Sequence, residues 1–158
     1  IMDLIIEGVQ EVGAVYRMIS EWDIDNIMRF PLTMIGIDGA HATEKNALDH
    51  PRTLATYPKL LGEFCRDKGV LTLEQMIRRM TGLAADFANF PRKGYVREGM
   101  DADLVVFDFA TINGKAGYGS ADVDNEGIHY VFVNGVKALE NGKRLPTRSG
   151  KVLLRNGK

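Results

Sequence analysis

The sequence predicts an α/β fold whose final part consists of strands alone. Near its start, an apolar segment, a helical pattern and a second apolar segment follow one another, which is the order of a βαβ unit. After Gly94 the hydrophobic period changes to two, the period of a strand. Of the 158 residues, 45% are hydrophobic and 26% are charged, close to the averages for soluble globular proteins. The length suits one ordinary domain or a piece of a larger one.

The first half is predicted to contain a strand, a helix and a second strand. The first strand is expected at Ala14–Ser20. Ser20 then begins a Ser-x-x-Asp capping pattern, and apolar residues from Ile24 onward share one helical face. Pro31 should end this helix, because the residue before a proline is driven out of the α region. Leu32–Ile37 is expected to be a strand buried on both faces, as in a parallel sheet covered by helices.

A long polar loop and further helices should follow. Asp38–Thr56 has no period, and a loop of this length is usually functional or disordered. The helical pattern returns from Leu60. Thr72 opens a capping box, Leu73–Met80 carries the apolar stripe behind it, and Gly82 stands where a glycine would close that helix.

The last part is predicted to be a set of antiparallel strands. Strands are expected at Ala102–Asp108, Ile128–Val133 and Val136–Leu139. Asn134-Gly135 lies between the last two and is the strongest short signal for a hairpin. Asn141-Gly142 predicts a further turn.

Charge and cysteine content exclude several classes of protein. Twenty basic against 21 acidic side chains give a net charge of −1, whereas nucleic-acid binders usually need a basic face. No apolar run reaches the length that spans a bilayer, so no membrane partner is expected. Cys65 is the only cysteine, which excludes an internal disulfide and a cysteine-rich zinc site. A cytoplasmic protein with a small buried thiol is therefore expected.

The candidate site is the loop after the second predicted strand. Asp38 lies at the carboxyl end of that strand, where parallel α/β proteins gather catalytic groups. A carboxylate there is suited to act as a general base or a metal ligand. The Asp-Gly pair is equally typical of a simple turn or a cap. The loop also carries His41, Asp49, His50 and Arg52.

Several strings, taken in order, resemble a known family. They are Met34-Ile35-Gly36-Ile37-Asp38-Gly39, His50-Pro51-Arg52-Thr53, Leu71-Thr72-Leu73-Glu74 through Met80-Thr81-Gly82, Gly99-Met100-Asp101-Ala102-Asp103-Leu104-Val105-Val106-Phe107-Asp108, and the hairpin Val131–Val136. Together they resemble the C-terminal part of the N-acyl-D-amino-acid deacylases, or D-aminoacylases, of the metal-dependent amidohydrolase superfamily. The resemblance extends from about Leu4 to Lys143.

The resemblance implies a fold, a reaction and two site residues. Residues 1–92 would form the last βα units of a (β/α)₈ barrel with the active-site loop, and residues 93–158 part of a small β-sandwich. Asp38 would lie at the zinc site as a metal ligand and catalytic base, taking a proton from the attacking water and returning it to the leaving amine. Arg52 would bind the α-carboxylate of an N-acyl-D-amino acid, a role that suits the planar guanidinium fork.

The chain also departs from the family pattern. Ile37 stands where the family usually has a serine before the catalytic aspartate. The early His-x-His motif and the central Cys and His ligands have no counterpart, so the zinc ligands are expected mostly outside this chain. The chain is therefore expected to be the last third of a hydrolase, inactive alone. An isolated chain should also self-associate, because the strand at Ala14–Ser20 would have an unpaired edge.

Other interpretations remain open for the loop residues and for the whole chain. Arg52 could instead pair with Asp49 or cap a helix, and His50 is expected to orient the loop through ring hydrogen bonds. His41 could join a partial zinc set or be merely solvated, and His129 is assigned no role. The alternative function is a stand-alone, degenerate amidohydrolase tail that serves as a binding or assembly module without catalysis.

Overall fold

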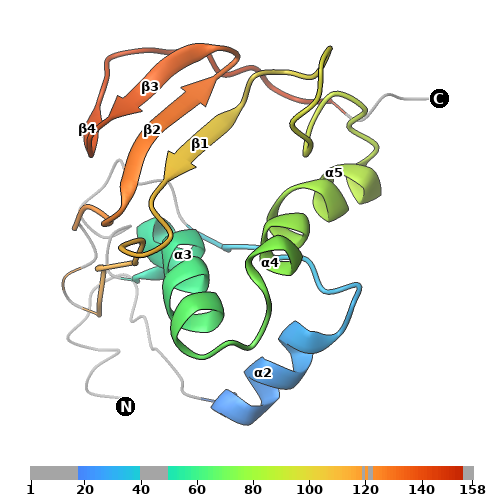
Figure 1. The fold of residues 1–158 in the computed structure, drawn as a ribbon, viewed down its shortest axis with the longest axis vertical. Coiled ribbons are helices and arrows are strands. Elements are labelled where there is room, and N and C mark those ends of the chain that lie inside the picture. The colour runs from blue at the N-terminus through green and yellow to red at the C-terminus, as the bar shows by residue number, and fades with distance from the viewer. Residues whose placement is uncertain (1–17, 40–49, 119, 121–122, 155–158) are drawn as a thin grey trace, which may run out of the picture.

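The described part of the chain is a group of helices followed by an antiparallel sheet (Figure 1). The structure is a computed structural model that describes residues 18–39, 50–118, 120 and 123–154. The helices are α2 (Glu21–Arg29), α3 (Arg52–Lys59), the π-helical η2 (Leu60–Asp67), α4 (Leu73–Met80) and α5 (Gly82–Ala88). The strands are β1 (Leu104–Phe107), β2 (Ile128–Val133), β3 (Val136–Glu140) and β4 (Lys143–Arg144), in that order across one sheet. The prediction that the final part contains strands and no helix holds for the described residues after α5.

Helix α2 has the predicted start and end. The Ser20 hydroxyl accepts a hydrogen bond from the backbone N–H of Asp23 at 3.2 Å, as an N-cap should. The helix ends at Arg29, shortly before Pro31. Buried Arg79 of α4 then donates to the carbonyls of Arg29, Phe30 and Thr33, at 3.4 Å for Arg29 and 3.1 Å for Thr33. One guanidinium therefore satisfies carbonyl groups at the end of α2 that have no helical partner.

Neither predicted parallel strand appears among the residues that the structure describes. Leu32–Ile37 pairs with no strand among the described residues, so the prediction of a strand in a parallel sheet is wrong for this chain as it stands. A strand requires a neighbour for its backbone hydrogen bonds, and the described residues place none beside this segment. Residues 14–17 of the other predicted strand lie outside the described residues, and residues 18–20 are not strand.

Helix α3 begins earlier than its sequence pattern suggests. The expected loop reaches to Thr56, but the helix starts at Arg52 and continues without a break into η2. Pro58 lies inside α3 and has no N–H to donate to the carbonyl of Leu54, four residues before it. That carbonyl instead accepts from Nδ2 of Asn125, in the loop before β2, at 2.8 Å. The irregularity in the helix thus creates an attachment point for a distant loop.

Helix α4 has the predicted capping box, in which Thr72 and Gln75 each accept from the other's backbone N–H. The prediction that Gly82 closes this helix is wrong. Helix α4 ends at Met80, Thr81 separates it from the next helix, and Gly82 is the first residue of α5. The physical reason for a glycine there is space, because an added Cβ would lie 2.8 Å from the ring of Tyr95.

The hairpins lie where the turn signals predict them. Asn134 and Gly135 both have positive φ, at 49° and 78°, between β2 and β3. Asn141 and Gly142 repeat this pattern between β3 and β4, with φ of 48° and 79°. Positive φ at both central residues is the geometry that favours Asn-Gly in tight hairpins.

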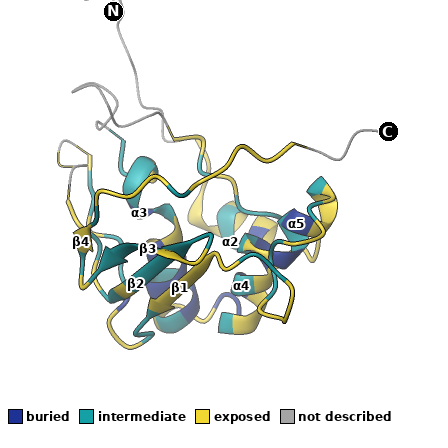
Figure 2. Cartoon of the chain, turned by 90° about the horizontal axis from the view of Figure 1, so that it is seen from above, coloured by how far each residue is buried: buried dark blue, intermediate teal, exposed yellow. Residues whose placement is uncertain are grey.

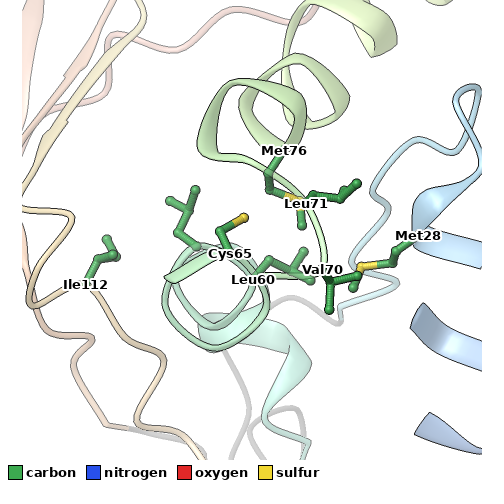
Figure 3. Packing of buried hydrophobic residues seen from close by; sticks show 8 residues of the cluster. Met28, Leu60, Cys65, Val70, Leu71, Met76 and Ile112 are labelled. Carbon is green, nitrogen blue, oxygen red and sulfur yellow. The ribbon is translucent and has the colours of Figure 1, made fainter. Parts of the chain in front are cut away.

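The core lies where the helices meet the loop after β1. Its buried residues are Met28, Leu60, Leu61, Cys65, Val70, Leu71, Met76 and Ile112 (Figure 3). Met76 of α4 and Ile112 of the loop after β1 are almost completely inaccessible, at 0% and 1% exposed. Cys65 is buried as expected, and burial raises the pKa of its thiol to about 11.

Much apolar surface is nevertheless exposed. Figure 2 shows β1 and the outer parts of the helices largely exposed. Trp22 is 74% exposed, and Phe30 and Leu32 are 59% and 67% exposed. Large apolar side chains this exposed on one helix and the segment after it suit a surface that other protein covers. None of the described helices has the length and apolarity needed to cross a membrane.

Candidate active site

The structure brings Asp38 and Arg52 together. Nη1 of Arg52 lies 3.2 Å from Oδ2 of Asp38, across a loop whose residues 40–49 lie outside the described part of the chain. Asp38 has a φ of 44°, a left-handed conformation that aspartate tolerates better than most residues. Gly39 lies against the start of α3, where an added Cβ would be 3.2 Å from Cα of Thr53. Gly39 therefore lies close to the helix that carries Arg52.

This ion pair contributes little to folding. The Asp38 side chain is 91% exposed and that of Arg52 is 45% exposed, and ion pairs in such positions contribute about 0–1 kcal/mol. Arg52 is also the first residue of α3, where the helix dipole disfavours a cation by about 0.3–1 kcal/mol. The position of the guanidinium thus has no evident structural benefit, and an accessible cation beside an accessible carboxylate is available for chemistry.

His50 connects Arg52 to a distant tyrosine. Its Nδ1 accepts a hydrogen bond from the backbone N–H of Arg52, with 3.1 Å between the nitrogens. Its Nε2 lies 3.3 Å from Oη of Tyr118, and the two rings meet edge to face with centroids 5.0 Å apart. Burial and the Arg52 guanidinium lower the pKa of His50, although the Asp38 carboxylate opposes the shift. The neutral form is favoured, and because Nδ1 accepts, Nε2 carries the proton and donates to Tyr118.

These contacts agree with the expectation that His50 orients the loop. Both ring nitrogens have partners in the protein, which leaves neither for a metal. His41 and Asp49 lie outside the described residues, so their proposed roles stay predictions. His129 lies in β2.

Sequence reasoning missed Tyr118. It lies in the loop between β1 and β2, 68 residues from His50 along the chain. A tyrosine between two glycines in an otherwise irregular segment is a weak signal. Only the folded loop shows that this ring meets the start of α3.

A pocket opens beside these residues. Its volume is about 340 Å³, and its walls come from α3, η2 and the loop between β1 and β2. The lining residues are His50, Pro51, Arg52, Ala55, Thr56, Lys59, Leu60, Phe64, Ala116, Gly117 and Tyr118. A mostly apolar cavity with a few convergent polar groups is typical of a small-molecule site.

The described residues provide only part of the ligands that a metal ion needs. The described residues contain no group of three or more His, Cys, Asp or Glu side chains placed to bind one ion. Asp38 is chemically suited to donate a carboxylate oxygen, and its exposed side chain is accessible. A catalytic zinc takes about three protein ligands, so Asp38 fits as one member of a larger set.

The chain matches known proteins over most of its length. Residues 23–137 match the model of the Amidohydrolase family. A D-aminoacylase of Alcaligenes xylosoxydans xylosoxydans is 37% identical over 151 residues, which cover 96% of this chain and 31% of that protein. The chain thus spans about a third of the length of this relative.

Solved structures agree with the sequence match. A crystal structure of D-aminoacylase superimposes with a TM-score of 0.87 at 38% identity, over 97% of this chain and 31% of that one. The structure of N-acyl-D-glutamate deacylase from Bordetella bronchiseptica, complexed with zinc and a phosphonate inhibitor, gives a TM-score of 0.77 at 33% identity. That match covers 85% of this chain and 28% of the other.

Proposed function

Because this chain belongs to the Amidohydrolase family, we propose that it is the C-terminal part of a zinc-dependent enzyme that removes the acyl group from N-acyl-D-amino acids. The relatives named above support this class of substrate. The observation that carries the proposal is the contact between Asp38 and Arg52. The relatives are deacylases, which favours a catalytic chain over the alternative, a non-catalytic module.

The chemistry of the substrate explains why these two groups should be neighbours. In an N-acyl-α-amino acid, a single carbon separates the amide nitrogen from the carboxylate. A residue that returns a proton to this nitrogen must therefore lie close to the residue that binds the carboxylate. Asp38 and Arg52, 3.2 Å apart, meet this requirement.

Each residue then has a definite task. Arg52 exchanges its partner Asp38 for the incoming α-carboxylate, to which its guanidinium can donate two parallel hydrogen bonds. Asp38 is released toward the amide, accepts a proton from the attacking water and delivers it to the leaving amine. A bound zinc would supply Lewis-acid polarisation of the scissile carbonyl, with the Asp38 carboxylate as one of its ligands.

The proposal also divides the chain. Residues 1–92 would contribute the last βα units of a (β/α)₈ barrel and residues 93–158 part of a small β-sandwich. The exposed apolar side chains of Trp22, Phe30 and Leu32 support this division, because the remaining barrel would cover them.

An assay on the complete enzyme tests the function. Purified with zinc, it should release acetate from N-acetyl-D-amino acids and leave the L-enantiomers intact. A matched pair of variants provides the control, because Arg92 and Asp101 form another arginine–aspartate pair, with 2.7 Å between Nη2 and Oδ1. Arg92→Lys and Asp101→Asn should keep wild-type turnover, whereas changes at Arg52 and Asp38 should not. Failure to hydrolyse any N-acetyl-D-amino acid would refute the proposal.

A further inference from the structure

We propose that His50 and Tyr118 are positioning residues for Arg52, so that the loop between β1 and β2 governs how firmly the enzyme holds the substrate's carboxylate. This inference rests on the proposed function, because it assigns its effect to the carboxylate that Arg52 is proposed to bind. It adds to that function a contribution from the sheet-forming part of the chain, which supplies neither Asp38 nor Arg52.

The first step is the contact between His50 and the backbone of Arg52. The N–H of Arg52 belongs to the first turn of α3, where helical N–H groups have no helical acceptor. Nδ1 of His50 accepts this N–H at 3.1 Å. The backbone from which the Arg52 side chain extends is therefore held by the imidazole, and the direction of the guanidinium depends on the orientation of that ring.

The second step is the contact that orients the ring. Since Nδ1 accepts, Nε2 is the protonated nitrogen and donates to Oη of Tyr118, 3.3 Å away. The edge-to-face packing, at an interplanar angle of 77°, restricts rotation of the imidazole further. Tyr118 is 55% exposed, so it buries too little area for a core residue. Besides lining the pocket, it contacts His50 through this hydrogen bond and the ring packing.

The third step is the attachment of the loop that carries Tyr118. Asn125 Nδ2 binds the Leu54 carbonyl that Pro58 leaves without a helical donor. Arg66 of η2 donates from Nη1 to the carbonyls of Phe109 and Ile112, at 3.2 and 2.7 Å. Ile112 itself is 1% exposed in the core. Described residues on both sides of Tyr118 are therefore hydrogen-bonded to α3 and η2, which restrains the tyrosine that contacts His50.

The test separates a positioning role from a structural one by using two substrates. The complete enzyme is assayed by acetate release on an N-acetyl-D-amino acid and on its carboxamide, which lacks the negative charge that Arg52 would bind. Tyr118→Phe keeps the ring and removes only the hydroxyl. We expect it to lower kcat/KM for the carboxylate substrate about three- to tenfold, the effect of one neutral hydrogen bond, and to change the carboxamide reaction far less. Tyr130→Phe, in β2, is the matched control.

Variants of His50 add a rescue experiment. The amide oxygen of asparagine takes the place of Nδ1, whereas glutamine places its amide nitrogen near Nε2. His50→Asn keeps an acceptor for the Arg52 N–H and should retain more kcat/KM than His50→Gln, with His129→Leu as the control for loss of a histidine. In an Arg52→Ala background, Tyr118→Phe should have no further effect, because the group that it positions is gone.

The outcomes separate the two proposals. If the wild-type enzyme discriminates between the substrates through Arg52, but Tyr118→Phe affects both substrates equally or adds fully to Arg52→Ala, the positioning role is wrong and the proposed function stands. If His50→Gln retains more activity than His50→Asn, the assigned hydrogen bond is wrong. If the enzyme hydrolyses neither substrate, or Arg52→Ala spares the carboxylate substrate, the function assigned to Arg52 fails and this inference fails with it.

Discussion

Replacing Asp38 with asparagine should separate catalysis from stability more cleanly than any other change in this chain. Asparagine has almost the same shape as aspartate but cannot carry the proton from water to the leaving amine. Loss of a general base typically lowers the rate 10²- to 10⁴-fold, which raises the activation barrier by about 3–5 kcal/mol. The stability of the protein should hardly change, because the side chain is 91% exposed and its ion pair with Arg52 contributes about 0–1 kcal/mol.

The assay measures kcat and thermal unfolding on the same preparation of the complete enzyme. We expect kcat for an N-acetyl-D-amino acid, measured at saturating zinc, to fall by at least two orders of magnitude, with the melting temperature close to wild type. KM should not rise, because Arg52 loses the carboxylate that competes with the substrate. Asp101→Asn, which also removes a carboxylate paired with an arginine, should leave kcat unchanged. Wild-type turnover in Asp38→Asn, or a loss of activity that merely follows a loss of folding, would refute the reasoning.

Three further predictions concern other parts of the chain. Arg52→Lys keeps the charge but loses the planar fork, so kcat/KM should fall for N-acetyl-D-amino acids and much less for their carboxamides; equal losses would argue against carboxylate binding. Arg79→Met leaves carbonyls at the end of α2 without donors and should destabilise the enzyme by about 2–4 kcal/mol in denaturant unfolding, while exposed Arg78→Met should not. Cys65, whose pKa is raised to about 11, should resist iodoacetamide in the native protein and react only after unfolding; rapid native labelling would contradict its burial.

Local signals in the sequence predict local structure well in this protein. The Asn134-Gly135 hairpin, the Ser20 N-cap and the Thr72 capping box all depend on residues a few positions apart, and all are found as predicted. The strand expected at Leu32–Ile37 fails because a strand depends on neighbours, not on its own residues alone. The prediction that Gly82 ends α4 is wrong for a similar reason. The need for a glycine there comes from the ring of Tyr95, thirteen positions along the chain.

In the candidate site, too, the sequence predicts what depends on local motifs and misses what depends on distant contacts. Asp38 and Arg52 are recognisable through short motifs, although their contact at 3.2 Å depends on the fold. Tyr118 has no motif at all. Its place beside His50 depends on how the loop after β1 attaches to α3, and that depends on a carbonyl that Pro58 leaves free. Interactions of this kind arise from packing between distant segments, which a single sequence does not reveal.

The most direct test is a crystal structure of the complete enzyme carrying Asp38→Asn, with zinc and an N-acetyl-D-amino acid bound. We expect the Arg52 guanidinium to have left residue 38 and to donate two hydrogen bonds to the α-carboxylate. The side chain at position 38 should lie within hydrogen-bond reach, about 2.6–3.2 Å, of the scissile amide nitrogen or of the attacking water. A substrate whose carboxylate binds elsewhere, with Arg52 facing solvent, would contradict the account.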